Sequence, residues 1–347
     1  MQTTTTRDTT IDFIKGILIL FVILGHTTLG LTDMYSFDDT MNGIANVIYS
    51  FHMPCFIAVS GFLYSEYVGN ASQGIFSQIG HKAFNILLPY VMISVIYWII
   101  KFALSNLIRE PIAVSSLISI PWKPIEFLWY LYALFLIYCV AYMADYVFAR
   151  LLPHFNYKME LLFVLFLIIA LTCYGRFHYE GFNYIAGFQM YFYLGCLIKK
   201  WLDKLDNRYA VLSIAVMSVL VEVSDIVLQD DMSSNPIFSS LFERFTACIV
   251  TVFIFAVSYF LSGYCDFPKW LQTIGRDSMP FYAMNVIFVG GIRIILNRAG
   301  ITNMALQCIC GFAGSTAICW ILYECIIKKI RFINFIFYPG KQLHIRK

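Results

Sequence analysis

Long apolar runs separated by short polar stretches dominate the chain, and their lengths predict its secondary structure. A helix needs about 20 mainly apolar residues to cross the hydrocarbon core of a bilayer. Runs near this length predict ten membrane helices, at about 11–30, 44–68, 83–104, 124–148, 159–175, 182–201, 209–228, 238–262, 278–297 and 302–326. The fifth run is the shortest, and the loops between runs are mostly brief. The pattern therefore predicts an all-α, polytopic bundle of about ten transmembrane helices.

The composition agrees with a membrane location. Of the 347 residues, 60% are hydrophobic and 13% are charged, whereas an ordinary soluble domain has about 25% charged residues. The leader MQTTTTRDTT lacks the basic start, short apolar run and cleavage site of a signal peptide, so we expect it to be retained. We expect residues 1–347 to form a single transmembrane domain, with 1–10 as a polar cytoplasmic leader and 327–347 as a basic cytoplasmic tail.

The ten cysteines do not indicate a metal site or a disulfide framework. Nine of them lie in apolar runs, and Cys265 lies just beyond one. No CxxC pair occurs, and Cys308 and Cys310 would point to different faces of a helix. We interpret the cysteines as small buried hydrophobic side chains, and we expect no bound metal.

Basic residues in the loops predict how the bundle is oriented, because Lys and Arg are retained on the cytoplasmic side. With the N-terminus inside, the inside segments hold 16 Lys and Arg residues and the outside loops hold 4. Both termini are therefore expected in the cytoplasm. The net charge of +3 reflects this asymmetry, so we expect a lipid bilayer as a partner and no nucleic acid.

A polar stripe runs along the first predicted helix. Lys15 and His26 are eleven residues apart, so they differ by about 20° around the helix and by about 16 Å along it. Asp12, Ile19 and Val22 lie on the same stripe. A polar stripe in a membrane helix must face protein or a water-filled cavity. Alternatively, Lys15 reaches the headgroups and pairs with Asp12, and His26 only bonds a carbonyl.

A second histidine favours a functional site. His52 lies in the second predicted helix, in the segment FHMPCF, at a depth comparable to that of His26. Pro54 removes a backbone donor and leaves the Ser50 carbonyl without its usual partner, so we expect a kink beside His52. Two histidines beside a kink indicate a site rather than two unrelated side chains.

These residues also form a recognisable pattern. The first helix resembles that of the acyltransferase-3 family of membrane O-acyltransferases, which reads Asp-x-x-Arg, ten residues, then His. Further segments are similar to later elements of that family in the same order, namely FHMPCF with SGFL, FLWYL at 127–131, FYLG at 192–195, and IGRDS at 274–278 followed by Tyr282. The chain departs from the pattern where Lys15 replaces the Arg, Asn85 a second basic residue, and Asn285 a late His.

The resemblance implies acyl transfer, with acetyl-CoA as donor and a hydroxyl of a cell-surface glycan or lipid-linked saccharide as acceptor. It also implies a plasma (inner) membrane enzyme that modifies an exopolysaccharide or lipopolysaccharide. A neutral imidazole, whose ordinary pKa is about 6.5, suits removal of the hydroxyl proton. We expect His26 to be this base or to carry the acyl group itself, with His52 or Ser60 orienting it or polarising the thioester.

Charged and aromatic residues supply candidates for the two substrates. The CoA phosphates need basic groups at the cytoplasmic side, and the candidates are Lys15, Lys82 and Arg276. The basic 199–208 loop is a further candidate, although orientation and lipid contact explain it better. The acceptor needs carboxylates and aromatic rings in the outer half, and the candidates are Glu126, Trp129, Glu222 and Asp225. Structural pairing is the alternative for some of these residues.

A proton-coupled transporter or exporter is the rival interpretation. Ten helices, membrane-embedded acids and histidines, and a kinked helix suit transport as well. The sequence shows no inverted repeat, and the first two helices fit an acyltransferase better. A structural scaffold would leave the two outer-half histidines unexplained.

The charge asymmetry generates a topological prediction. Reporter fusions after Asp39 and after Asp231 should read as external, and a fusion after Lys204 should read as cytoplasmic, because 16 basic residues lie on one side and 4 on the other. A cytoplasmic signal at Asp39 would invert the orientation and move His26 to the inner half of the bilayer.

Overall fold

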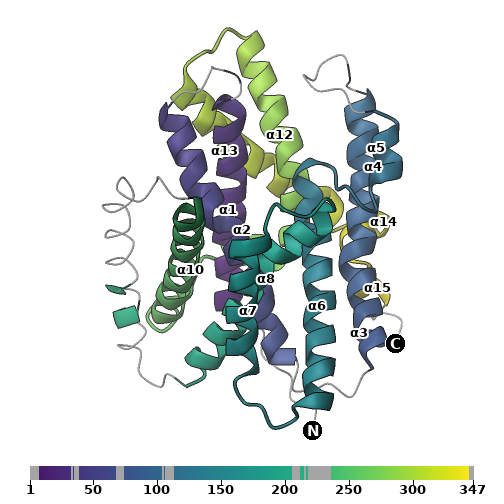
Figure 1. The fold of residues 1–347 in the computed structure, drawn as a ribbon. Helices are drawn as coiled ribbons and strands as arrows, with labels where there is room; N and C mark the ends of the chain where they lie inside the picture. The colour runs from purple at the N-terminus through teal and green to yellow at the C-terminus, as the bar shows by residue number, and fades with distance from the viewer. Residues whose placement is uncertain are drawn as a thin grey trace. The chain divides into compact units, whose positions relative to one another are not determined.

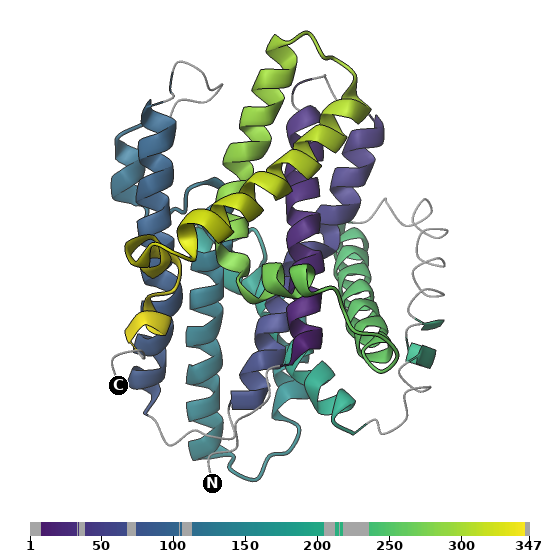
Figure 2. The same ribbon diagram turned by 180° about the vertical axis from the view of Figure 1, so that it is seen from behind.

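The described chain is helical. A computed structural model describes residues 8–32, 34, 39–67, 74–103, 105, 113–204, 212–214, 216–217 and 236–343, and no strand occurs among them (Figures 1 and 2). In chain order the elements are α1 (Thr9–Thr32), α2 (Asp39–Tyr67), α3 (Ile75–Lys82), η2 (Ala83–Leu87), α4 (Leu88–Ala103), α5 (Ser115–Ser119), η3 (Glu126–Leu128), α6 (Trp129–Leu151), α7 (Lys158–Cys173), α8 (Glu180–Leu202), α10 (Pro236–Leu261), α11 (Lys269–Arg276), α12 (Ser278–Arg298), α13 (Met304–Leu322), η4 (Tyr323–Ile327), α14 (Arg331–Phe337) and α15 (Pro339–Leu343). The all-α prediction is confirmed for these residues.

The long helices match the apolar runs of the sequence. Within the described residues, seven helices are long and apolar enough to cross a membrane, at Thr9–Thr32, Thr40–Ser65, Ile75–Ala103, Glu126–Leu151, Ser239–Leu261, Ser278–Arg298 and Met304–Ile327. The fifth and sixth predicted runs form α7, which has 16 residues, and α8. The seventh run, 209–228, lies largely outside the described residues. The membrane character is thus confirmed, while the number ten and the orientation stay predictions.

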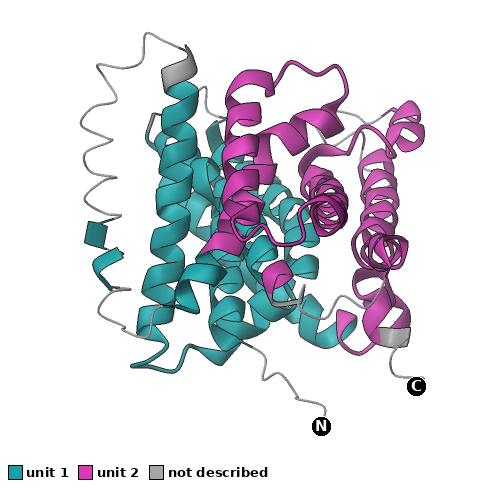
Figure 3. Cartoon of the chain, turned by 60° about the horizontal axis from the view of Figure 1, so that its bottom comes forward, with its two compact units in different colours: residues 1–62, 198–326 teal, residues 63–197, 327–347 magenta. Residues whose placement is uncertain are grey.

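The chain divides into two compact units, and each unit is made of two separate stretches of sequence (Figure 3). The first unit comprises residues 1–62 and 198–326, and the second comprises residues 63–197 and 327–347. The first therefore holds α1, most of α2, and α10 to α13. The second holds α3 to α7, most of α8, and the C-terminal α14 and α15.

Helix α1 is the centre of the first unit. It packs against α10, α11, α12 and α13, and apolar side chains on several of its faces are fully buried, among them Ile14, Leu18 and Ile23. A helix that is apolar all round belongs in a protein core or in a membrane. The surroundings of α1 therefore decide where its polar residues point.

The short helix α11 approaches α1 unusually closely, and in Figure 2 it lies crosswise against α1. A β-carbon at Gly16 would lie 3.0 Å from the carbonyl carbon of Leu271, and one at Gly275 would lie 2.6 Å from the Gly16 nitrogen. Glycine is therefore required on both sides of this contact. Next to it, the rings of Phe13 and Phe267 stack with centroids 3.7 Å apart. We call the contact between Gly16 and Gly275 the glycine seam.

The second unit is organised around α6 and the continuous segment α3–η2–α4. The π-helical turn η2 interrupts the regular hydrogen bonding of this segment and contains Asn85. The C-terminal stretch, predicted as a basic tail, forms α14 and α15, which pack against α4 and η2. Phe335 meets Phe84 with centroids 6.4 Å apart, and a β-carbon at Gly340 would lie 3.0 Å from the Asn85 carboxamide carbon. The tail is therefore part of this unit's packing.

The tight contact at the glycine seam predicts that a side chain added there lowers the stability of the protein. Gly275→Ala should lower the free energy of unfolding by about 1–3 kcal/mol, because the added methyl group meets backbone atoms that cannot rotate away. Thermal unfolding of the detergent-solubilised protein measures this. Gly290→Ala on α12 is the matched control, since no atom of the described residues lies within 4 Å of a β-carbon there. Equal unfolding temperatures for the two variants would show that α11 does not depend on the seam.

Candidate functional site

The two predicted histidines lie in the first unit and meet through a tyrosine. The Tyr49 hydroxyl lies 3.0 Å from His26 Nδ1, and the Tyr49 and His52 rings are in edge-to-face contact with centroids 5.0 Å apart. His52 is 3% exposed. Helix α1 supplies His26, and α2 supplies the other two residues. The prediction that the histidines belong to one cluster therefore has a structural link, the ring of Tyr49.

The hydrogen bond of His52 fixes its ring. Its Nδ1 lies 2.6 Å from the Ile48 carbonyl oxygen, and a carbonyl can only accept, so Nδ1 carries the hydrogen. In a neutral imidazole the other nitrogen, Nε2, is then the acceptor. Either group can donate in the contact between His26 and Tyr49. The cluster thus combines imidazole and phenol groups that can accept and donate protons.

Helices α1 and α2 run in opposite directions. Residues 26 and 49 meet at one end, while Phe62 near the end of α2 contacts Tyr259, whose hydroxyl bonds Asp8 before α1. Ser60 lies eleven residues after Tyr49, and Lys15 lies eleven residues before His26. Ser60 is therefore about level with Lys15, and it is about 12 Å along α2 from His52. The structure does not bring Ser60 together with the histidines.

Two of the three basic residues predicted to bind the donor are sequence neighbours of the glycine seam. Arg276 directly follows Gly275, and Lys15 directly precedes Gly16, so the seam holds the backbones of both residues close together. Lys15 is half-buried and Arg276 is exposed. Two cations at one end of α1 suit a ligand that carries phosphate groups.

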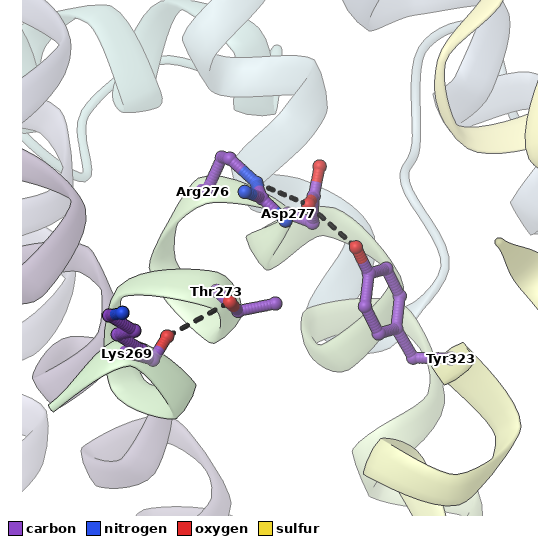
Figure 4. A network of polar contacts seen from close by, with 5 residues as sticks. All are labelled: Lys269, Thr273, Arg276, Asp277 and Tyr323. Carbon is purple, nitrogen blue, oxygen red and sulfur yellow. Dashed lines mark hydrogen bonds and ion pairs between the residues drawn. The ribbon is translucent and has the colours of Figure 1, made fainter. Parts of the chain in front are cut away.

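Arg276 belongs to a network of polar contacts (Figure 4). Its Nε donates to Asp277 Oδ2 over 2.8 Å, and the Tyr323 hydroxyl donates to the same oxygen over 2.7 Å. The hydrogen bond with Asp277 is the main cause of a raised pKa for Arg276. The guanidinium is therefore a permanent cation with a fixed point of attachment.

A third cation lies on the other side of His26. A β-carbon at Gly30 would lie 3.0 Å from Arg293 Cζ, so the absent side chain makes room for a guanidinium from α12. Gly30 lies one helical turn beyond His26, on nearly the same face. The structure thus places Arg293 of α12 against α1.

The other described candidates lie in the second unit. Lys82 Nζ lies 3.7 Å from the centre of the Tyr138 ring. The Glu126 carboxylate accepts from Tyr97 over 2.5 Å and pairs with Lys101.

Two further features mark the start of α6. Glu126 has a φ of 44°, a left-handed conformation that is uncommon for a residue with a side chain. Trp129 stacks on Tyr184 with centroids 5.2 Å apart. The acid and the ring proposed for a glycan thus share this helix start, and both have partners within the protein.

Two of the predicted acceptor residues, Glu222 and Asp225, lie outside the described residues. Among the described residues, no group of three or more His, Cys, Asp or Glu side chains is arranged to hold a metal ion. All ten cysteines lie in the described part of the chain, and none of them forms a disulfide there.

Sequence reasoning missed Tyr49, Asp277 and Tyr323. Tyr49 stands three residues before His52, so helical periodicity places it beside that histidine, but tyrosines are common in membrane helices. Asp277 stood inside the IGRDS segment without an assigned role. Tyr323 is 46 residues from Asp277 along the chain, and no local pattern connects them.

Comparison with known proteins gives a family and two relatives. A family model described as an acyltransferase domain matches residues 8–324. The nodulation protein NolL of Mesorhizobium japonicum is 31% identical over 156 residues, which are 44% of this chain and 38% of that protein. The nodulation protein NolL of Sinorhizobium fredii is 39% identical over 87 residues, 24% of this chain and 22% of that protein. The matches thus span well under half of these relatives. No solved structure matches the chain significantly.

Proposed function

The chain belongs to the acyltransferase-3 family, whose model covers residues 8–324, and on this premise we propose that it is a membrane O-acyltransferase. In this proposal an acyl group, preferably acetyl, moves from cytoplasmic acyl-CoA to a hydroxyl of a cell-surface glycan or lipid-linked saccharide. The observation that carries the proposal is the contact between His26 of α1 and Tyr49 of α2, two helices that are each long and apolar enough to cross a membrane. A histidine in such a helix is costly unless it faces protein or water, and such a residue usually marks a functional site.

The reaction needs one proton acceptor that later becomes a donor. The acceptor hydroxyl attacks the thioester carbonyl carbon, and its proton passes to an imidazole nitrogen. The carbon–sulfur bond then breaks, and the imidazolium returns the proton to the CoA sulfur. We assign this role to His26. Alternatively, His26 takes the acyl group as an acyl-imidazole and passes it on.

Neighbouring groups support this assignment. Tyr49 holds the His26 ring through Nδ1, which fixes the direction of the opposite nitrogen, Nε2. His52 packs against Tyr49 and is held by the Ile48 carbonyl. A ring that is already oriented loses less entropy when the substrates arrive. In our proposal Tyr49 and His52 therefore hold the base. His52 is the second group that can take up the proton, because its Nε2 carries a lone pair.

The two ends of α1 suit the two ends of an acyl-CoA. Its phosphates would bind at Lys15 and Arg276, which the glycine seam holds together. Extended pantetheine measures on the order of 15–20 Å, and the rise from Lys15 to His26 is about 16 Å. The thioester would then reach His26 while the nucleotide stays at the cytoplasmic end. The acceptor would approach from the side of Arg293.

The remaining candidates complete the proposal for the substrates. In the second unit we assign Lys82 to the donor, and Glu126 and Trp129 to the acceptor. The exposed Glu126 carboxylate and the partly exposed Trp129 ring suit hydroxyl bonding and ring stacking on a saccharide. Glu222 and Asp225 stay acceptor candidates on sequence grounds. The proposed location is the plasma (inner) membrane, with both termini in the cytoplasm.

The first prediction concerns the base. His26→Ala should reduce acyl transfer by about 10²–10⁴-fold, since this is the usual contribution of general-base catalysis, and His26→Gln should be nearly as inactive. Purified protein is assayed for acetyl-CoA-dependent acceptor acylation and for CoA release. Binding of CoA and the unfolding temperature should change little, because the ring lies near the thioester rather than the phosphates.

The same assay separates the proposal from its rival. A transporter with a structural His26 would show substrate flux that does not depend on acetyl-CoA. Substantial turnover by a folded His26→Ala protein would remove His26 from the chemistry. Tyr49→Phe is the conservative companion variant: it keeps both imidazoles and removes the bond to Nδ1, so it should lose less activity than His26→Ala.

The second prediction concerns the donor. Lys15→Ala should weaken acetyl-CoA binding about ten- to a hundred-fold, because one hydrogen bond to a charged group is worth about 1.5–3 kcal/mol. Lys15→Arg should retain binding, since a guanidinium also donates to phosphate. Arg298→Ala removes one positive charge at the exposed far end of α12 and is the control. Unchanged affinity in the Lys15→Ala protein would show that this lysine only reaches the headgroups.

A further inference from the structure

We propose that Asp277 and Tyr323 are positioning residues that hold the Arg276 guanidinium ready for a phosphate of the acyl donor. This inference rests on the proposed function, because it concerns the donor end of the same site. It goes further by assigning roles to two residues that do not themselves bind the donor. The assignment comes from the network in Figure 4.

The network attaches Arg276 at one edge. Nε donates to Asp277 Oδ2 over 2.8 Å, and this oxygen also accepts from the Tyr323 hydroxyl over 2.7 Å. The Asp277 side chain is 7% exposed, whereas the Arg276 side chain is 42% exposed. The anchor is thus buried and the cation is accessible. An arginine held in this way offers donors in a fixed fork, which is the geometry that phosphate recognition uses.

Three elements meet in this network. Arg276 is the last residue of α11, and Asp277 is the cap between α11 and α12. Tyr323 is the first residue of η4 and caps the end of α13. The glycine seam fixes α11 against α1 beside Lys15. Tyr323 is also packed by Phe281 of α12, with ring centroids 5.4 Å apart. The position of the guanidinium is therefore set by α1, α12 and α13 together rather than by the local loop.

Holding the cation has an energetic consequence. A free arginine side chain loses rotamer entropy when it orders on a ligand, which lowers the affinity for that ligand. An arginine already ordered by a buried carboxylate lost this rotamer entropy when the protein folded, so it loses less on binding the ligand. The negative charge of the Asp277 carboxylate acts in the opposite direction, because a carboxylate beside the cation repels phosphate. The two effects predict opposite changes in donor affinity when Asp277 loses its charge, so one measurement separates them.

The test measures CoA binding to full-length protein in detergent or nanodiscs by titration calorimetry, with CoA itself as the probe. Asp277→Asn should weaken binding about ten-fold, the size expected for a lost bond to a charged group. Tyr323→Phe keeps the ring packing and should weaken binding by a smaller factor. Thr273→Val is the matched control, because the Thr273 hydroxyl donates to the Lys269 carbonyl within α11 and is not part of the bonds to Asp277.

A double-mutant cycle shows whether Asp277 acts through Arg276. In an Arg276→Ala background, Asp277→Asn should cause no further loss of affinity, because no guanidinium remains to be held. Additive losses would mean that Asp277 supports the fold only and would overturn the inference. Tighter binding by Asp277→Asn would overturn it as well, since it would show competition with phosphate.

Two further outcomes keep the inference separate from the proposed function. If wild-type protein does not bind CoA, the proposed function fails, and the inference fails with it. If wild-type protein binds CoA and Arg276→Ala weakens it, while Tyr323→Phe and Asp277→Asn leave it unchanged, only the inference fails. Should Asp277→Asn not fold, Tyr323→Phe decides alone, and its unfolding temperature shows that the comparison is between folded proteins.

Discussion

The close approach of α11 to α1 at the glycine seam is the contact on which the proposed site depends. Gly16 and Gly275 let two backbones meet where any β-carbon would overlap backbone atoms. This contact places Arg276 beside Lys15, and it fixes the loop that carries Asp277. Without this contact, the backbones of Lys15 and Arg276 would not be held close together.

Helix α1 then connects two chemically different ends. One end presents cations, which suit phosphate, and the other end presents the His26–Tyr49–His52 cluster, which suits proton transfer. Polar residues within a membrane helix must face protein or water, so α1 can carry both ends only because α2, α10, α11, α12 and α13 surround it or contact it. The same enclosure keeps the stripe between the two ends away from lipid.

The membrane helices and the histidine cluster were within reach of sequence reasoning, for physical reasons. Run length and hydropathy depend on the bilayer, so the predicted runs coincide with described helices except at 209–228. His26 and His52 stand out because a polar residue in an apolar helix is costly. Helix α11 was missed because its eight residues include Lys269 and Arg276 and resemble a loop.

Contacts between distant segments were out of reach. Tyr323 bonds Asp277 across 46 residues, and such a pairing follows from the packing of α13 rather than from any local pattern. Ser60 is a different case, because its role in orienting His26 was expected from the resemblance. Its distance along α2 from His52 follows from the sequence, whereas its place level with Lys15 follows from the opposite directions of α1 and α2. Depth along a helix can be estimated from sequence, whereas the facing residue on the neighbouring helix cannot.

The most direct measurement of the central claim is where the two ends of an acyl-CoA lie. An acyl-CoA analogue with a photoreactive acyl group, cross-linked to the wild-type protein and mapped by mass spectrometry, reports the thioester end. The account predicts labels on α1 and α2 around His26, Tyr49 and His52, and it predicts that excess CoA abolishes them. Labels confined to α14 and α15, or labels that excess CoA does not reduce, would contradict a donor that reaches from the glycine seam to His26.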